Sequence, residues 1–327
     1  EDYSNKNVSI LNVGNVLVDI EISISNKQLS EIPIQKGRAI EINSDELAFY
    51  LSKYKSQITD QYLGGSIFTT AATSSIFKIN NLFLGSVGKD NNSKFLIDIM
   101  NTYPIKTFLN VDPQNTGCCL IFLTPDKERT MAACPGASGQ LTLANFTETE
   151  DFDYIFSDLY SLNSIINKKT ISHLLSSNKG LILSLSDISV MKKHMDFIKK
   201  YSDQIKIIAG NEDEMKYLEQ AMNSSLISAS RKNNKLYIIT KGSSGSLILH
   251  KGIEYVSEAI ATEVRSLNGA GDTYLGAFIG CYMETEDIQY SGNVANYFSH
   301  VAVQQNNACL TLSNLQSTKN AAKAAFL

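Results

Sequence analysis

The 327-residue sequence contains no apolar run that approaches the ~20 residues of a membrane-spanning helix. It also lacks dense clusters of lysine and arginine, because 29 basic residues stand against 33 acidic ones, for a formal net charge of −4. These absences argue against a membrane or a nucleic acid as the main partner. Residues 1–6 are polar and do not resemble a secretion signal, so we expect a cytoplasmic protein.

Cysteine is sparse as well. An odd number of cysteines is present, and their spacing fits neither a CxxC pair nor a disulfide framework. We therefore expect free thiols in a reducing compartment. They are Cys118, Cys119, Cys134, Cys281 and Cys309.

Two common nucleotide-binding motifs are missing. There is no GxxxxGK[ST] loop, which excludes a P-loop NTPase, and no GxGxxG after the first predicted strand, which argues against a Rossmann dehydrogenase. The segment 85–90, GSVGKD, only mimics a P-loop, because its spacing is wrong and no Ser or Thr follows the lysine.

What the sequence does contain is a regular alternation of two patterns. With 43% apolar and 19% charged residues, the composition is that of a globular protein, long enough for roughly two domains. Short apolar runs alternate with helical patterns, which indicates an α/β fold with a mostly parallel sheet and helices on both faces. The predicted strands are 8–13, 82–84, 154–156, 181–185, 205–209 and 236–239, and the predicted helices are 68–79, 93–100, 190–200 and 212–218.

Two stretches depart from this rhythm. Residues 16–25 alternate apolar and polar side chains, which predicts a strand with one wet face. Residues 118–123 and 129–133, separated by the polar turn 124–127, predict a hairpin. These stretches suggest a small accessory sheet.

The segment 268–273, NGAGDT, is the most informative for chemistry, and the apolar run 274–282 follows it. Its two glycines let the backbone pass close to a ligand, and the next helix directs its free N–H groups into the same space. We therefore expect an anion there, with Asp272 placed to accept a proton from an attacking hydroxyl. The alternative is that Asp272 only caps the helix.

Three weaker segments leave similar alternatives open. Residues 64–66, GGS, belong to a ligand site or form a plain helix entry capped by Ser66. Residues 240–245, TKGSSG, form a nucleotide loop or a hairpin turn. Residues 211–214, NEDE, follow a strand at the edge where open α/β sheets bind ligands. A carboxylate there suits Mg²⁺ held through water, or it only complements the helix dipole.

Taken in order, these motifs resemble those of the ribokinase-like, or PfkB, family of sugar and nucleoside kinases. The resemblance covers residues 8–309, and NGAGD is its most specific element. The matching motifs are GNxLxD at 14–19, GGS at 64–66, GxVGxD at 85–90, TG at 116–117, NExE at 211–214, TxGxxG at 240–245 and NGAGD at 268–272.

The resemblance implies a three-layer fold in which a large α/β nucleotide-binding domain carries a small β-sheet lid. It assigns residues 1–15, 41–105 and 136–327 to the large domain, and residues 16–40 and 106–135 to the lid. The family transfers the γ-phosphoryl group of ATP to a primary hydroxyl with the help of Mg²⁺.

The resemblance also implies roles for single residues. Asp272 corresponds to the catalytic base, and Gly269, Ala270 and Gly271, preceded by Asn268, correspond to the anion hole. The implied acceptor-binding residues are Asn15, Asp19, Gly64, Gly65, Ser66 and Thr69, the ATP-binding residues are Asn211, Thr240, Gly242, Gly245 and Asn296, and Glu214 would hold Mg²⁺ through water.

Within the family, the sequence is most similar to adenosine kinases, because Asn15, Ser66 and Asn268 stand at matching places in their motifs. Arg129 lies where those enzymes carry a lid arginine near the transferred phosphate; the alternative is an ordinary surface charge on the hairpin. We therefore expect adenosine as the acceptor.

Three positions depart from the family pattern. Thr69 replaces an Asn that binds acceptor hydroxyls, Ser266 replaces an Asp of a monovalent-cation site, and Asn307 replaces a Gly. They leave open a sugar kinase for ribose, fructose or a ketodeoxy sugar acid, and also a binding protein without catalysis. They also argue against a monovalent cation. Because family lids either cover one site or pair between subunits, a monomer and a homodimer both remain open.

Overall fold

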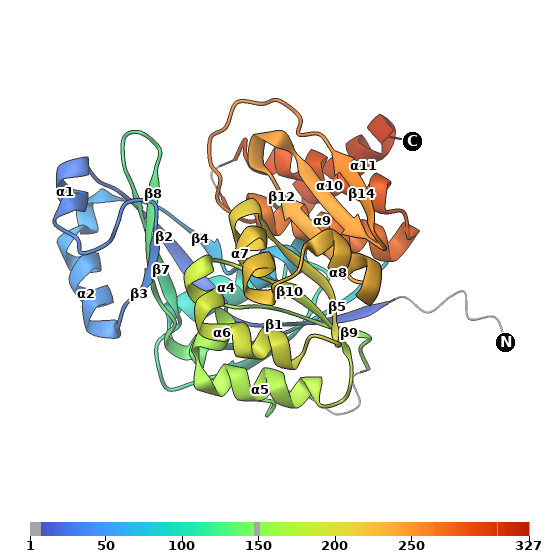
Figure 1. Cartoon of the computed structure of the whole chain (residues 1–327). Helices are drawn as coiled ribbons and strands as arrows, with labels where there is room; N and C mark the ends of the chain where they lie inside the picture. Colours follow the sequence, from blue (N-terminus) through green and yellow to red (C-terminus); the bar gives the residue numbers. More distant parts are fainter. Residues whose placement is uncertain (1–7, 147–150, 306, 327) are drawn as a thin grey trace.

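The computed structural model describes residues 8–146, 151–305 and 307–326, so the polar residues 1–6 lie outside it. In this part of the chain the strands form two separate sheets, one of nine strands and one of five (Figure 1). None of the described helices is long and apolar enough to cross a membrane.

The large sheet has the order β14-β13-β12-β11-β10-β9-β1-β5-β6. Pairing is parallel from β12 to β6, and only β13 and β14 join it antiparallel. All six strands predicted from apolar runs belong to this sheet, so the predicted α/β architecture is confirmed. Its strands are β1 (Ser9–Val13), β5 (Asn80–Val87), β6 (Lys106–Val111), β9 (Tyr154–Asp158), β10 (Gly180–Ser184), β11 (Ile205–Asn211), β12 (Leu236–Thr240), β13 (Ser246–His250) and β14 (Ile253–Ser257).

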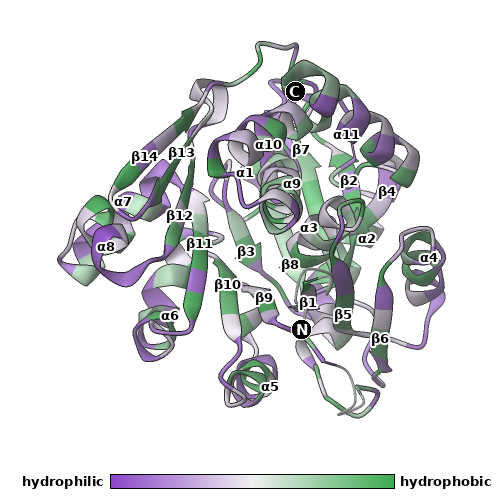
Figure 2. Ribbon diagram, turned by 90° about the vertical axis from the view of Figure 1, so that its right-hand side faces the viewer, coloured by the Kyte–Doolittle hydropathy of each residue, from purple (hydrophilic) through white to green (hydrophobic). Residues whose placement is uncertain are grey.

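Helices cover both faces of this sheet and complete three layers (Figure 2). Successive residues of a strand point to opposite faces, so Ile10 of β1 joins one apolar core and Leu11 joins the other. The first core packs α3 (Ser66–Ser74), α4 (Asn91–Met100), α9 (Ala270–Thr285), α10 (Ile288–Ala302) and α11 (Leu312–Phe326), and the second packs α5 (Ile165–Leu175), α6 (Ile188–Lys200), α7 (Glu212–Met222) and α8 (Leu226–Asn233).

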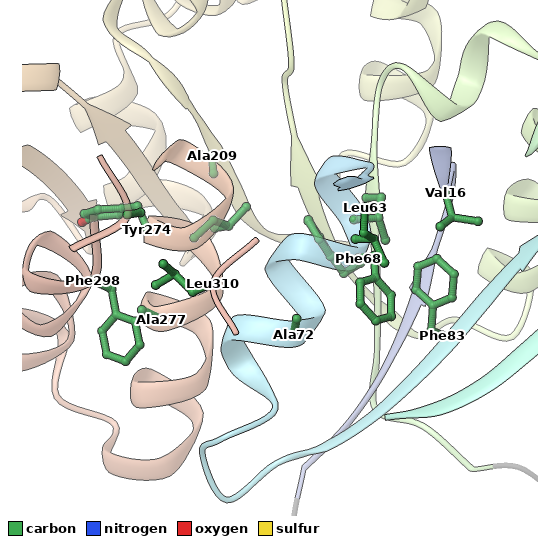
Figure 3. Close-up of a cluster of buried hydrophobic side chains, with 14 of the residues drawn as sticks. Val16, Leu63, Phe68, Ala72, Phe83, Ala209, Tyr274, Ala277, Phe298 and Leu310 are labelled. Atoms are coloured by element: carbon green, nitrogen blue, oxygen red, sulfur yellow. The ribbon is translucent and has the colours of Figure 1, made fainter. Parts of the chain in front are cut away.

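Helices α3 and α9 lie against one another in the first core. Figure 3 shows Phe68 and Ala72 of α3 and Tyr274 of α9 within one buried cluster. Gly276 permits this packing, because a Cβ there would overlap the carbonyl oxygen of Thr70. The contact brings the N-terminal ends of both helices, and thus two of the predicted motifs, to the same place.

The small sheet has the order β3-β8-β7-β2-β4. The predicted hairpin is confirmed as the antiparallel pair β7–β8. Helices α1 (Asn26–Ser30) and α2 (Ser44–Lys53) lie on the side of the small sheet away from the large one (Figure 1). The strands are β2 (Leu17–Ser23), β3 (Ala39–Glu41), β4 (Ile58–Gly64), β7 (Cys118–Leu123) and β8 (Arg129–Cys134).

The two faces of the small sheet differ in what they meet. On the outer face, Phe122 makes edge-to-face contacts with Tyr50 of α2 and with Tyr54, at 5.8 and 5.9 Å between ring centroids. On the inner face, Cys119 and Ile121 cluster with Ala308 of the large domain. Asp19 lies on this inner face, so the wet face predicted for β2 points toward the large domain.

The boundaries of the lid differ from the predicted ones at two places. Residues 106–111, predicted as lid, form β6, which pairs in parallel with β5 at the edge of the large sheet. Residues 58–64, predicted as part of the large domain, form β4, which pairs with β2 in the small sheet. β6 is an edge strand and mixes exposed and buried residues, as a lid strand does, so its pattern does not distinguish the two sheets. The first four residues of β4 are all exposed, so this segment has no clear strand pattern in the sequence.

Candidate active site

Helix α9 begins with an open N-terminus. Gly269 is its N-cap, with a φ of +71° that favours glycine, and a Cβ there would overlap the carbonyl oxygen of Ala308. A Cβ on Gly271 would meet no atom within 4 Å, so the first turn faces free space. No side chain caps this helix, and Asp272 lies within its first turn, which removes the capping alternative. Free N–H groups at such a terminus favour an anion.

Asp272 lies where two helix N-termini and one strand end converge. Its backbone oxygen accepts a hydrogen bond from the Thr70 hydroxyl of α3 at 3.2 Å. Burial, together with the charge of Asp158, raises the pKa of its carboxyl to about 7 against the opposing effect of a hydrogen bond from Ser66. A carboxylate with such a pKa accepts a proton readily near neutral pH.

A cavity of about 180 Å³ lies directly against this turn. Residues from four separate motifs line it, namely the helix turn of α9, the start of α3, the end of β11 and the end of β12. Parallel strands present their carboxyl ends at one edge, and this is the edge where open α/β sheets bind ligands. The predicted site residues that line the cavity are Ser66, Asn211, Glu214, Thr240, Gly271 and Asp272.

Asn211 and Glu214 form a reciprocal cap at the start of α7. The Asn211 side chain accepts from the Glu214 backbone N–H at 2.9 Å, while the Glu214 carboxylate accepts from the Asn211 backbone at 3.0 Å and from its Nδ2 at 2.7 Å. Burial raises the pKa of Glu214. Part of this motif therefore serves the helix itself, while the carboxylate also borders the cavity.

The described residues hold no cluster of three or more His, Cys, Asp or Glu side chains suited to a metal ion. A lone carboxylate beside a small polar cavity does fit Mg²⁺, which keeps several waters and takes its other ligands from phosphates. Glu214 is the residue that would hold such an ion, through water.

Asp19 is packed among polar groups from both domains. It is 7% exposed and stands directly opposite Tyr62 in the β2–β4 register. Gly64 provides the space that the Asp19 carboxylate occupies, because a Cβ at this position would overlap that carboxylate. Burial raises the pKa of Asp19 to about 7; the Asn268 side chain and the Arg129 charge lower it, and Asp272 raises it. The structure thus brings five predicted site residues together, namely Asp19, Gly64, Arg129, Asn268 and Asp272.

A separate cavity of about 990 Å³ lies between α2, the open end of the β7–β8 hairpin and the large domain, and Asp19, Arg129 and Asp272 do not line it. Asn15 lines it, held by Asn167, whose amide donates to the Asn15 side chain at 3.3 Å. Gly65, with a φ of +107°, passes close to the carbonyl oxygen of Asn15. Tyr160 borders both cavities.

Several predicted residues border neither cavity. Thr69 is 1% exposed, and its side chain forms a hydrogen bond with the Cys309 thiol. The Asn296 amide is buried and donates to the Ser257 carbonyl oxygen at 2.9 Å. Gly242 and Gly245 turn the chain between β12 and β13 with positive φ angles.

Three neighbours of the site were not predicted from the sequence. Asp158 is 3% exposed and ends β9, and its charge acts on Asp272. The Tyr62 hydroxyl is buried without a hydrogen-bond partner beside Asp19. Tyr160 separates the two cavities. The rule that carboxyl ends of strands carry ligands would have pointed to Asp158, whereas nothing local marks Tyr62.

Comparison with known proteins decides the family. Residues 38–315 match the pfkB family carbohydrate kinases. The chain belongs to this family. It is therefore a kinase with a hydroxyl acceptor, and ATP use follows from membership.

Relatives of known name agree with this assignment. The chain is 24% identical to an adenosine kinase of Dictyostelium discoideum, over 94% of this chain and 98% of that protein. A probable sugar kinase of Rhizobium etli superposes with a TM-score of 0.85 at 21% identity, covering 98% and 99% of the two chains. The adenosine kinase of Sinorhizobium meliloti superposes with a TM-score of 0.83 at 19% identity, covering 98% and 100%. These likenesses confirm the ribokinase-like fold.

Proposed function

We propose that the protein transfers the γ-phosphoryl group of ATP to the primary hydroxyl of adenosine. The observation that carries this proposal is the meeting of Asp272 with the N-terminus of α9 on the 180 Å³ cavity, close to Asp19 and Arg129 of the small sheet. Phosphoryl transfer needs a hydroxyl, a proton acceptor and an anion site in such proximity.

Each carboxylate has its own task in this proposal. Asp19 binds the acceptor hydroxyls, and Asp272 takes the proton of the attacking hydroxyl. The amides of Gly269, Ala270 and Gly271 stabilise the charge on the transferred group. The small sheet, closed by Arg129, keeps water from competing for the phosphoryl group.

The nucleotide lies along the carboxyl edge of the sheet in this proposal. Asn211 and Thr240 bind phosphate oxygens, and Gly242 and Gly245 let the backbone approach the nucleotide. Glu214 would hold Mg²⁺ through its water ligands, and the ion would neutralise phosphate charge. Asn296 reaches the adenine only if its present hydrogen bond to Ser257 is exchanged.

The relatives of known name favour adenosine as the acceptor. The relative from Dictyostelium discoideum, matched over nearly its whole length, is an adenosine kinase.

A sugar kinase is the second candidate. The likeness to a probable sugar kinase supports it.

A substrate panel tests the proposal. ADP release is measured with ATP and adenosine, ribose, fructose or a ketodeoxy sugar acid. We expect the highest kcat/KM with adenosine. Higher turnover of a sugar would favour the second candidate, and tight adenosine binding without ADP release would contradict a catalytic function.

A further inference from the structure

Cys118 and Cys134 stand opposite one another across the hairpin of the small sheet. Cys118 begins β7, Cys134 ends β8, and the two are register partners in the antiparallel pair. Opposite residues of such a pair point to the same face, with Cα atoms about 4.5–5.5 Å apart. Disulfides bridge Cα separations of about 4.4–6.8 Å, so the backbone already provides the required spacing.

Both residues form part of the wall of the 990 Å³ cavity. They are 3% and 7% exposed, and neither forms a disulfide. The Cys118 thiol accepts a hydrogen bond from Asn92 Nδ2 at 3.4 Å. Burial raises the pKa of Cys118 to about 12, with a smaller contribution from Cys134.

We propose that Cys118 and Cys134 form a dithiol modification site in the cavity wall, which a low-molecular-weight disulfide oxidises to an intramolecular disulfide. One cysteine thiolate attacks a sulfur of the reagent and releases one thiol, leaving a mixed disulfide. The second cysteine thiolate attacks the protein sulfur of that bond and releases the other thiol. The two protein thiols are oxidised, and the reagent is reduced to two thiols.

Neighbouring cysteines do not share this arrangement. Cys119 follows Cys118 directly, so its side chain points to the opposite face, toward Asp19. Cys281 lies within α9, and Cys309 lies in the segment before α11. The register therefore selects one pair.

Oxidation changes acceptor binding, a consequence that rests on the proposed function. The bond draws Cys118 away from Asn92 and constrains the β7–β8 hairpin, whose opposite face carries Cys119 beside Asp19. We expect the acceptor KM to rise about threefold to tenfold, the equivalent of one hydrogen bond, and to return to its first value with a dithiol reductant.

The test uses the full chain and hydroxyethyl disulfide. Peptide mass spectrometry after alkylation of the denatured protein should find Cys118 linked to Cys134. Cys118→Ser and Cys134→Ser should each lack the bond, and the control Cys281→Ser should form it. Phenylarsine oxide, which bridges two close thiols, should add to the wild type and to Cys281→Ser but not to the first two variants.

Three results would overturn the proposal: mixed disulfides alone, a bond between other cysteines, or unreacted Cys118 and Cys134 after the partly exposed Cys309 has reacted. An unchanged acceptor KM in the oxidised enzyme would overturn its kinetic part. If the linkage forms in a protein that phosphorylates no acceptor, the modification site is supported and the proposed function fails.

Discussion

The guanidinium group of Arg129 donates a hydrogen bond to the hydroxyl of Ser266 and so joins the lid hairpin to the loop that leads into α9. The same charge lowers the pKa of Asp19, after the larger effect of the Asn268 side chain. The Arg129 side chain therefore contacts the segment before the NGAGD motif and also acts on Asp19 of the small sheet. Arg129 and Ser266 are 137 residues apart in sequence.

Removing this link should impair catalysis. Arg129→Met keeps much of the apolar stem but loses the charge and the hydrogen bond, so the lid is held less firmly and Asp19 loses a favourable neighbour. Because a charged hydrogen bond contributes about 1.5–3 kcal/mol, we expect kcat/KM to fall roughly 10- to 100-fold. Steady-state kinetics measure this, with Arg129→Lys as the matched control that keeps the charge. Unchanged kcat/KM in Arg129→Met would show that the link is unimportant.

The same contact bears on monovalent cations. Ser266 stands where the family carries a carboxylate, and its hydroxyl is engaged by a protein cation. We therefore expect nearly equal rates in KCl and in NaCl at matched ionic strength. Strong activation by K⁺ over Na⁺ would mean that other groups rebuild the cation site.

Asp272 should act as the proton acceptor. Asp272→Asn keeps the shape of the side chain but cannot take a proton, so turnover should fall about 10²–10⁴-fold while ATP binding is retained. Since burial raises the pKa of Asp272 to about 7, wild-type kcat/KM should rise with pH through neutrality and level off above it. A near-normal rate in Asp272→Asn, or a flat pH profile from 5 to 9, would disprove the assignment.

Asp19 should reduce stability at neutral pH. Its folded pKa of about 7 exceeds the ordinary 3.8, so the folded state binds the proton more tightly, and stability falls as pH rises from about 4 to 7. At pH 8 the free energy of unfolding of Asp19→Asn, measured by urea denaturation, should therefore exceed that of the wild type by on the order of 2–4 kcal/mol. This difference should vanish below pH 4. Its acceptor KM should rise.

Asp126 provides a control of opposite sign. It is exposed, and hydrogen bonds from Lys36 and Thr124 lower the pKa of its carboxyl to about 2. Asp126→Asn should therefore lose a little stability at pH 8. A loss of stability in Asp19→Asn at that pH would contradict the expected penalty.

Much of the fold could be predicted because buried parallel strands are continuous apolar runs. Residues 205–209 and 236–239 show this, and both lie in the large sheet. The helix predicted over 68–79 instead ends at Ser74. Phe77 and Ile79 lie in the turn that follows, where they are buried and continue the apolar spacing of the helix. Periodicity alone does not distinguish such a turn from helix.

The site was predictable only where glycines and helix starts mark it. Gly269 is such a glycine, because it caps α9 with a positive φ angle, and Gly271 lies in the first turn facing free space. The approach of Asp158 to Asp272, and of Tyr62 to Asp19, depends on sheet register and helix packing, which leave no local signal. Asn296, predicted to reach the adenine, has a buried amide that donates a hydrogen bond to the Ser257 carbonyl oxygen.

The Tyr62 hydroxyl should contribute to acceptor binding. It is buried opposite Asp19 and near the Asn268 side chain, and in the described part of the protein it makes no hydrogen bond of good geometry, which is costly unless a ligand supplies one. Tyr62→Phe removes only this hydroxyl, so we expect the acceptor KM to rise about threefold to tenfold with kcat nearly unchanged. The ATP KM should stay the same, and Tyr237→Phe, on β12 and hydrogen-bonded to Asn233, provides the matched control. If Tyr62→Phe leaves the acceptor KM unchanged while it stabilises the fold, the hydroxyl is a buried cost without a role in binding.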